Sequence, residues 1–79
     1  MSTPIKHLTV RRFGEKLRAL RKQHNMTHVD LAAVLGYASS SQISFLETGK
    51  KKPTADLILK ISKLFNISAD LLLDDELDM

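Results

Sequence analysis

The 79-residue chain contains no cysteine and no tryptophan, and its apolar residues are scattered among polar ones. Without cysteine it can form neither a disulfide nor a thiolate metal site, and it suits a reducing compartment. No apolar stretch approaches the roughly 20 residues that cross a bilayer. The opening segment MSTPIKHLTV is also too short and too interrupted for a signal peptide. These absences predict a cytoplasmic protein without membrane contact.

Residue combinations typical of enzymes are missing too. The three histidines, His7, His24 and His28, lack metal-ligand spacing with acidic residues. No serine–histidine–aspartate arrangement can be assembled, and the three isolated glycines do not form a phosphate-binding loop. We therefore expect no enzymatic activity, no cofactor, no metal and no small-molecule ligand.

Positive charge is concentrated in one part of the chain. Residues 1–69 hold all twelve lysines and arginines but only four acids, whereas the last ten residues hold the other five acids and no base. The body therefore carries +8, twelve minus four, although the net charge is only +3. Such a body attracts polyanions, because phosphate contacts supply most non-specific affinity for nucleic acids. The alternative is a basic surface that only keeps a small domain soluble.

The segment Thr27 to Lys52 predicts two short helices joined by a tight turn. The first has a strong start signal, because Thr27 can act as N-cap and Asp30 can reach back as in a capping box. Its buried side is expected to consist of Val29, Leu31, Ala32 and Leu35. Gly36 can take positive φ and end the helix.

The second helix of this segment is expected to begin with another capping box, formed by Ser39 and Gln42. Ile43 and Leu46 share its buried face, and the exposed faces carry Ser40, Ser41, Ser44 and Phe45. Gly49 ends the helix, and three lysines follow at 50–52. Small polar residues beside a cluster of cations suit a DNA major groove and its phosphates. Two core helices followed by a solvated lysine loop are the other interpretation.

Three further helices complete the prediction. The first spans Thr9 to His24 and buries Val10, Phe13, Leu17 and Leu20, while Arg11, Arg12, Lys16, Arg18 and Lys22 cover its other faces. The fourth spans Thr54 to Phe65, with Thr54 as N-cap and a buried stripe of Leu57, Ile58, Ile61, Leu64 and Phe65. No segment alternates with a period of two, so the fold class should be all-α, a compact five-helix bundle.

The fifth helix is short and begins at the cap residue Ser68. Leu73 and Leu77 are four residues apart and would share a helical face. Because so small a domain cannot easily bury every leucine here, this face is a candidate homodimer contact. Alternatively, these leucines complete the monomer core and the acidic end frays. We expect a mobile arm over residues 1–8, the helical domain over 9–73 and an acidic tail over 74–79.

The order of these elements resembles the phage repressor/Cro type of helix-turn-helix domain, the XRE family. The residues that carry the resemblance are FGEKLRALRKQHNMTHVDLAAVLG, SSSQISFLETGKKKPTADLILKISKLFNIS and the following DLL, over about residues 10–73. The resemblance implies a lambda repressor-like DNA-binding domain that regulates transcription as a homodimer on a near-palindromic site in double-stranded DNA. It also implies that residues 39–48 form the recognition helix.

The resemblance assigns roles to individual residues. The positions that face base edges are those of Ser40, Ser41, Ser44 and Phe45, and Ser39 joins this DNA-binding set as the cap beside them. His28, Thr48, Lys50 and Lys51 match positions near the DNA backbone, although an ordinary exposed histidine is the other interpretation of His28. Gln42 either reaches a base or phosphate, adenine being its usual bidentate partner, or is held in the capping box. Arg21 and Glu47 match a structural ion pair that joins the first helix to the third.

Two features depart from the family pattern. The turn at Gly36, Tyr37 and Ala38 is one residue longer than usual, and the base-facing positions are mostly serine, with no arginine for guanine. Specificity can then depend on DNA shape or water. The alternative function is a protein-interaction or antitoxin-like module that uses the same fold without strong DNA specificity.

Overall fold

Five α-helices and no strands make up residues 11–78, the part of the chain that the computed structural model describes. They are α1 (Phe13–Gln23), α2 (His28–Leu35), α3 (Ser41–Thr48), α4 (Ala55–Phe65) and α5 (Ala69–Leu73). The all-α fold predicted from the sequence is confirmed over this range. The predicted arm at residues 1–8 lies outside it.

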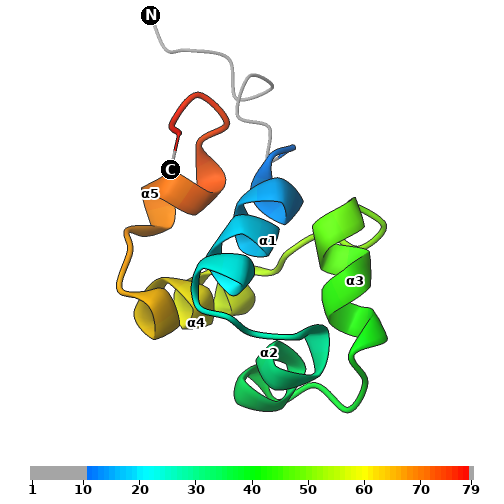
Figure 1. Cartoon of the computed structure of the whole chain (residues 1–79). Helices are drawn as coiled ribbons and strands as arrows, with labels where there is room; N and C mark the ends of the chain where they lie inside the picture. The colour runs from blue at the N-terminus through cyan, green and yellow to red at the C-terminus, as the bar shows by residue number, and fades with distance from the viewer. Residues whose placement is uncertain (1–10, 79) are drawn as a thin grey trace, which may run out of the picture.

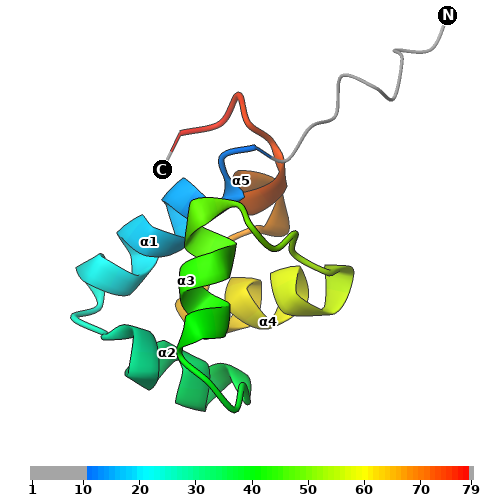
Figure 2. The same cartoon turned by 90° about the vertical axis from the view of Figure 1, so that its right-hand side faces the viewer.

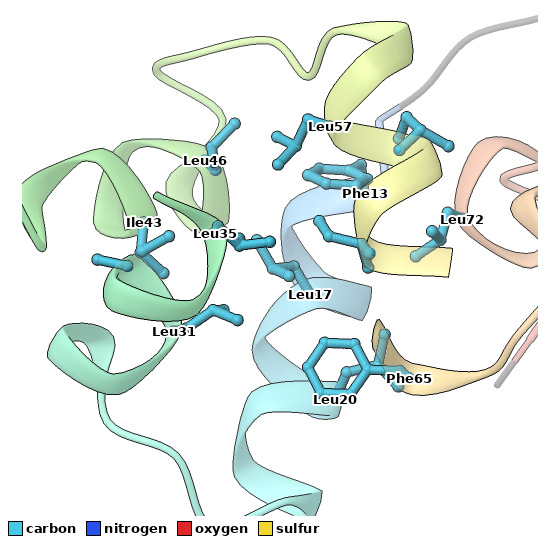
Figure 3. Close-up of a cluster of buried hydrophobic side chains, with 13 residues drawn as sticks. Phe13, Leu17, Leu20, Leu31, Leu35, Ile43, Leu46, Leu57, Phe65 and Leu72 are labelled. Carbon is cyan, nitrogen blue, oxygen red and sulfur yellow. The ribbon is translucent and has the colours of Figure 1, made fainter. Parts of the chain in front are cut away.

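The helices surround one apolar core (Figure 3). α1 packs against α3, α3 against α2, and α5 against both α4 and α1 (Figures 1 and 2). Leu17, Leu31 and Ile43 are completely buried where the first three helices meet, and Ile61 and Leu72 are buried on the side of α4 and α5. The core therefore supports α3 from behind and leaves its outer side free of contacts with the other helices.

Most of the predicted helix ends are confirmed. The Thr27 side chain accepts from the Asp30 N–H at 3.0 Å, and the Asp30 carboxylate accepts from the Thr27 N–H at 2.9 Å. Thr54 and Ser68 cap α4 and α5 in the same way, by accepting from a backbone N–H three residues on. Left-handed residues end α2, α3 and α4 at Gly36, Gly49 and Asn66.

The start of α1 differs from the prediction. Thr9 and Val10 lie outside the described residues, but Arg11 and Arg12 are not helical, and α1 begins only at Phe13 and ends at Gln23. The backbone N–H groups of Arg11 and Arg12 donate to the carboxylate of Asp75 at 2.9 Å. A side chain 63 residues away in the sequence thus satisfies the N–H groups at this helix start.

Lys16 is buried, not exposed as predicted. Its side chain is enclosed between α1 and α5, and Nζ donates to the carbonyl oxygens of Leu71 and Asp74, the latter at 2.7 Å. A cation suits this place, because the last carbonyl groups of a helix carry partial negative charge. Arg12 adds an ion pair with Asp78 at 2.8 Å. Residues 74–78 are therefore folded back onto α1, in contrast to the alternative in which the acidic end frays.

Three apolar residues also lie elsewhere than predicted. Val29 is 65% exposed and Leu64 39% exposed, whereas Leu31, Ala32 and Leu35 fill the core side of α2 and Phe65 fills that of α4. Leu73 is the last residue of α5, since Asp74 adopts an extended backbone. Leu77 follows the helix and cannot share a helical face with Leu73, although both are about 40% exposed.

Gly14 sets the distance between α1 and α3. A Cβ atom at this position would lie 2.6 Å from the carbonyl oxygen of Leu46 and closer still to that of Glu47. Both obstacles are backbone atoms, so they cannot rotate away as a flexible side chain would. Only glycine permits this approach, and the sequence pattern gave no sign of it.

We expect Gly14→Ala to lower the free energy of unfolding by about 1–3 kcal/mol, as overpacking does, despite the better helix propensity of alanine. Urea denaturation followed by circular dichroism measures this. The control is Arg18→Ala, which introduces alanine at an exposed position of the same helix. It should change the free energy of unfolding by less than about 0.5 kcal/mol. A Gly14→Ala protein as stable as the wild type would show that α1 and α3 are not so close.

We expect Asp75→Asn to lower the free energy of unfolding by about 1.5 kcal/mol, the low end for hydrogen bonds to a charged group, because the bonds from Arg11 are exposed and the bond from Arg12 is only partly buried. The matched control is Glu76→Gln, the same change at the neighbouring exposed acid, with an effect within about 0.5 kcal/mol. Hydrogen exchange at the Arg11 and Arg12 amides gives a local readout. Unchanged protection of both amides would contradict the contact.

Candidate nucleic-acid interface

The outer side of α3 is a polar surface with one aromatic residue. Ile43 and Leu46 are the residues of this helix that enter the core. Ser41, Phe45 and Thr48 lie on the opposite face and are exposed, and Figure 2 shows α3 at the front of the molecule. A helix held in this way can enter a groove of a partner without disturbing the core.

The predicted capping box at the start of this helix is wrong. Ser39 and Ser40 precede the helix, and the N-cap residue Ser40 makes no side-chain cap bond. Ser39 Oγ instead accepts from the Ser41 N–H at 3.2 Å and shares a hydrogen bond with Ser41 Oγ at 2.7 Å. The Gln42 amide oxygen accepts a hydrogen bond from Lys51 Nζ instead, because an ammonium is a stronger donor than a backbone N–H.

Two lysines after α3 fold back against side chains of the helix and the preceding turn. Lys51 Nζ donates to Gln42 Oε1 at 2.7 Å and lies 4.9 Å from the centre of the Tyr37 ring. Lys50 Nζ lies 5.9 Å from the centre of the Phe45 ring. Positive charge is thus brought beside both the middle and the start of α3. Tyr37 was not predicted as a site residue, and the longer turn was its only signal in the sequence.

Arg21 and Glu47 form a nearly buried ion pair between α1 and the end of α3. Arg21 Nε lies 2.7 Å from Glu47 Oε2, and the two side chains are 11% and 5% exposed. A second guanidinium nitrogen donates to the other carboxylate oxygen at 3.2 Å, and a third to the carbonyl oxygen of Met26 at 2.9 Å. This two-point contact fixes the direction in which α3 leaves the core.

His28 joins the same ion pair from the start of α2. Its Nε2 lies 3.2 Å from Glu47 Oε1, and its side chain is 40% exposed. Burial alone would raise the pKa of Glu47, but the hydrogen bonds from Arg21 and His28 outweigh burial and hold its pKa below the ordinary value. Glu47 is therefore ionised in the folded protein, and it connects α1, α2 and α3.

The residues predicted to contact DNA gather around α3. Ser39 and Ser40 lie at its entry, Ser44 is half-buried on the helix, and the Thr48 hydroxyl donates to the Ser44 carbonyl oxygen at 2.9 Å. His28 stands apart on α2 and faces Glu47.

Within residues 11–78 no three acidic, histidine or cysteine side chains are placed to hold a metal ion. In the same range no helix is both long and apolar enough to cross a membrane.

Residues 17–72 match the sequence model of a family described as helix-turn-helix. The chain is 42% identical over 64 residues to the HTH-type transcriptional activator BcrR of Enterococcus faecalis, an alignment that covers 81% of this chain and 31% of that protein. It is 37% identical over 61 residues to the uncharacterized HTH-type transcriptional regulator YobD of Bacillus subtilis, covering 77% and 54%. The chain thus spans about a third of BcrR and about half of YobD.

Among solved structures, the chain is similar to the P22 c2 repressor in complex with a synthetic operator. The TM-score is 0.69 and the sequence identity is 33%, and the match covers 77% of this chain and 91% of the repressor chain.

We expect Glu47→Gln to destabilise the protein by about 3 kcal/mol at about pH 7, because it leaves Arg21 without a counter-charge in a nearly buried site. The pKa of Glu47 is lowered on folding, so its contribution is present above the ordinary value of 4.5 and is lost as the pH falls below it. The difference between wild type and variant, measured by urea denaturation, should therefore shrink as the pH falls through this range.

The control for this experiment is Glu15→Gln, which removes a carboxylate that is 63% exposed and pairs with Arg12 at the surface. It should change stability by less than about 1 kcal/mol, as exposed ion pairs do. A Glu47→Gln deficit that stayed constant down to the acid limit would show that the carboxylate charge does not stabilise the fold.

Proposed function

This chain belongs to the helix-turn-helix family of transcriptional regulators, and from this membership we propose that it binds double-stranded DNA and regulates transcription in the cytoplasm. The observation that carries the proposal is the exposed outer face of α3, with Lys50 and Lys51 folded alongside it. A helix with small polar side chains fits the major groove, and adjacent ammonium groups suit its phosphates.

The charge distribution supports this proposal. Five of the nine acids lie in the last ten residues. Of these, Asp75 and Asp78 contact Arg11 and Arg12 at the start of α1. Glu47, the acid on α3, is nearly buried and neutralised by Arg21. The outer face of α3 therefore carries no exposed carboxylate of its own that would repel a phosphate.

Within this proposal, Ser40, Ser41, Ser44 and Phe45 contact base edges, and Thr48 and Lys50 contact the backbone. His28 is a conditional phosphate contact. While its Nε2–H donates to Glu47, a neutral imidazole has no proton on Nδ1, so only the protonated ring can also donate to a phosphate. Arg21 and Glu47 position α3 without touching DNA.

We further propose that two copies bind a near-palindromic operator, with their recognition helices in successive major grooves about 34 Å apart. Leu73 and Leu77 are the proposed contact between the copies, because both remain about 40% exposed. Exposed large apolar residues are candidates for a protein interface. The half-sites of the operator would then mirror the two-fold axis of the dimer.

A protein-interaction or antitoxin-like role is the second candidate. It is favoured by Phe45, Val34 and Leu59, which are exposed by 39%, 55% and 51%. The serines of α3 also carry little base preference of their own. In this case the outer face of α3 would bind a protein partner, and the salt dependence of DNA binding would be shallow.

Binding to a pool of randomised synthetic duplexes, followed by gel-shift titration at several salt concentrations, tests the proposal. We expect an enriched sequence, a steep loss of affinity with salt, and two protomers per enriched duplex by sedimentation. Phe45→Ala should change which sequences are enriched, since Phe45 lies on the outer face. Lys52→Ala, which removes an exposed cation beyond the helix, should weaken all duplexes alike.

Absence of any enriched sequence, together with shallow salt dependence, would refute the DNA-binding proposal. One protomer per duplex would refute the dimer alone.

A further inference from the structure

The hydrogen bond between Gln42 and Lys51 changes what α3 can recognise. We propose that the two side chains form one hydrogen-bond donor pair that selects guanine over adenine in the major groove. This inference rests on the proposed DNA-binding function and names the base preference of the same surface. It reverses the expectation from the sequence, in which glutamine favours adenine and no arginine is present for guanine.

The orientation of the Gln42 amide follows from its partner. A lysine ammonium has three donors and no acceptor, so the atom that faces it at 2.7 Å must be the amide oxygen. The opposite orientation would place two donors against each other. The amide nitrogen therefore points away from Lys51, and within residues 11–78 it makes no hydrogen bond. Gln42 presents two free N–H groups, and its oxygen is shared with an ammonium group.

Lys51 is held in place by more than this bond. Its backbone N–H donates to the carbonyl oxygen of Phe45 at 3.1 Å, which fastens the loop to α3. Its ammonium lies 4.9 Å from the centre of the Tyr37 ring, where a cation is attracted to the ring face. Gln42 and Lys51 are both half-buried, so neither side chain moves as freely as one on an open surface. The donor pair is thus formed before any DNA arrives.

Base chemistry decides what such a pair can bind. A glutamine that reads adenine must accept from the N6 amino group and donate to N7 at the same time. The Gln42 oxygen keeps a second lone pair, but an adenine amino group bound there would lie beside the Lys51 ammonium, and repulsion between the positively charged hydrogens weakens this bond. Guanine presents two acceptors in the major groove, O6 and N7, and so matches two donors. Cytosine offers a donor and thymine a single acceptor, so both fit less well.

The place of the pair on the helix is suitable for such a contact. Gln42 is three residues before Phe45, so the two side chains are neighbours on the helix surface. It lies at the edge of the outer face that Ser41 and Phe45 form, on the side toward the loop with Lys51. A base next to the one that Phe45 touches would therefore meet the donor pair.

The test compares wild type with Lys51→Met, which keeps an unbranched apolar side chain but removes the ammonium. Matched duplexes derived from the enriched sequence carry guanine or adenine at each position in turn. For wild type we expect one position per half-site at which guanine is preferred. In Lys51→Met the freed amide oxygen can accept from adenine, so the ratio of guanine to adenine affinity at that position should fall by about tenfold or more.

Lys50→Met is the matched control, since it makes the same change at the adjacent lysine, which lies over Phe45 instead. It should leave the guanine-to-adenine ratio at that position unchanged. Gln42→Ala should abolish the guanine preference without creating one for adenine. Thermal unfolding of each variant by circular dichroism shows whether the fold is retained.

Two results would overturn the inference while leaving the proposed function intact. One is a Lys51→Met protein that binds all duplexes more weakly by the same factor, because Lys51 would then contact only phosphate. The other is a wild type that prefers adenine at the position sensitive to Gln42. Failure of the wild type to enrich any sequence would instead remove the proposed function, and this inference with it.

Discussion

Glu47 is the residue on which the arrangement of the first three helices depends. Its backbone carbonyl lies against Gly14 near the start of α1, and its side chain is held by Arg21 two turns later on the same helix. His28 reaches it from α2. Two contacts from one helix, separated along that helix, determine both the distance and the tilt of α3. A recognition surface on a short helix needs such support, because an isolated helix of eight residues is unstable in water.

How far the sequence predicts the structure depends on whether a residue's partner is local. The caps at Thr27, Thr54 and Ser68 were predictable, since each hydroxyl bonds a backbone group three residues away. The buried faces followed from helical periodicity. Lys16 was misassigned because its partners lie on α5, and the Ser39–Gln42 capping box failed because Lys51 competes for the amide. Such long-range competition leaves no trace in local spacing.

The ion pair between Arg21 and Glu47 was predictable from the family resemblance but not from local sequence patterns. Neither composition nor periodicity links Arg21 to Glu47 across 26 residues, whereas the resemblance named both. It could not supply the third member, His28, or the close approach at Gly14. The resemblance also carried no information on Tyr37, which lies in the turn that departs from the family pattern. The features particular to this chain are therefore those that only its own structure reveals.

The half-buried cluster of Tyr37, Gln42 and Lys51 has a consequence for protein engineering. Its three members come from the turn before α3, from the helix itself and from the loop after it. A graft of residues 41–48 onto another scaffold would leave the aromatic platform and the ammonium behind, and the transplanted glutamine would regain a free carbonyl oxygen. The smallest portable unit is thus the continuous segment 37–51, and chimaeras built from the helix alone would inherit its shape without its hydrogen-bonding pattern.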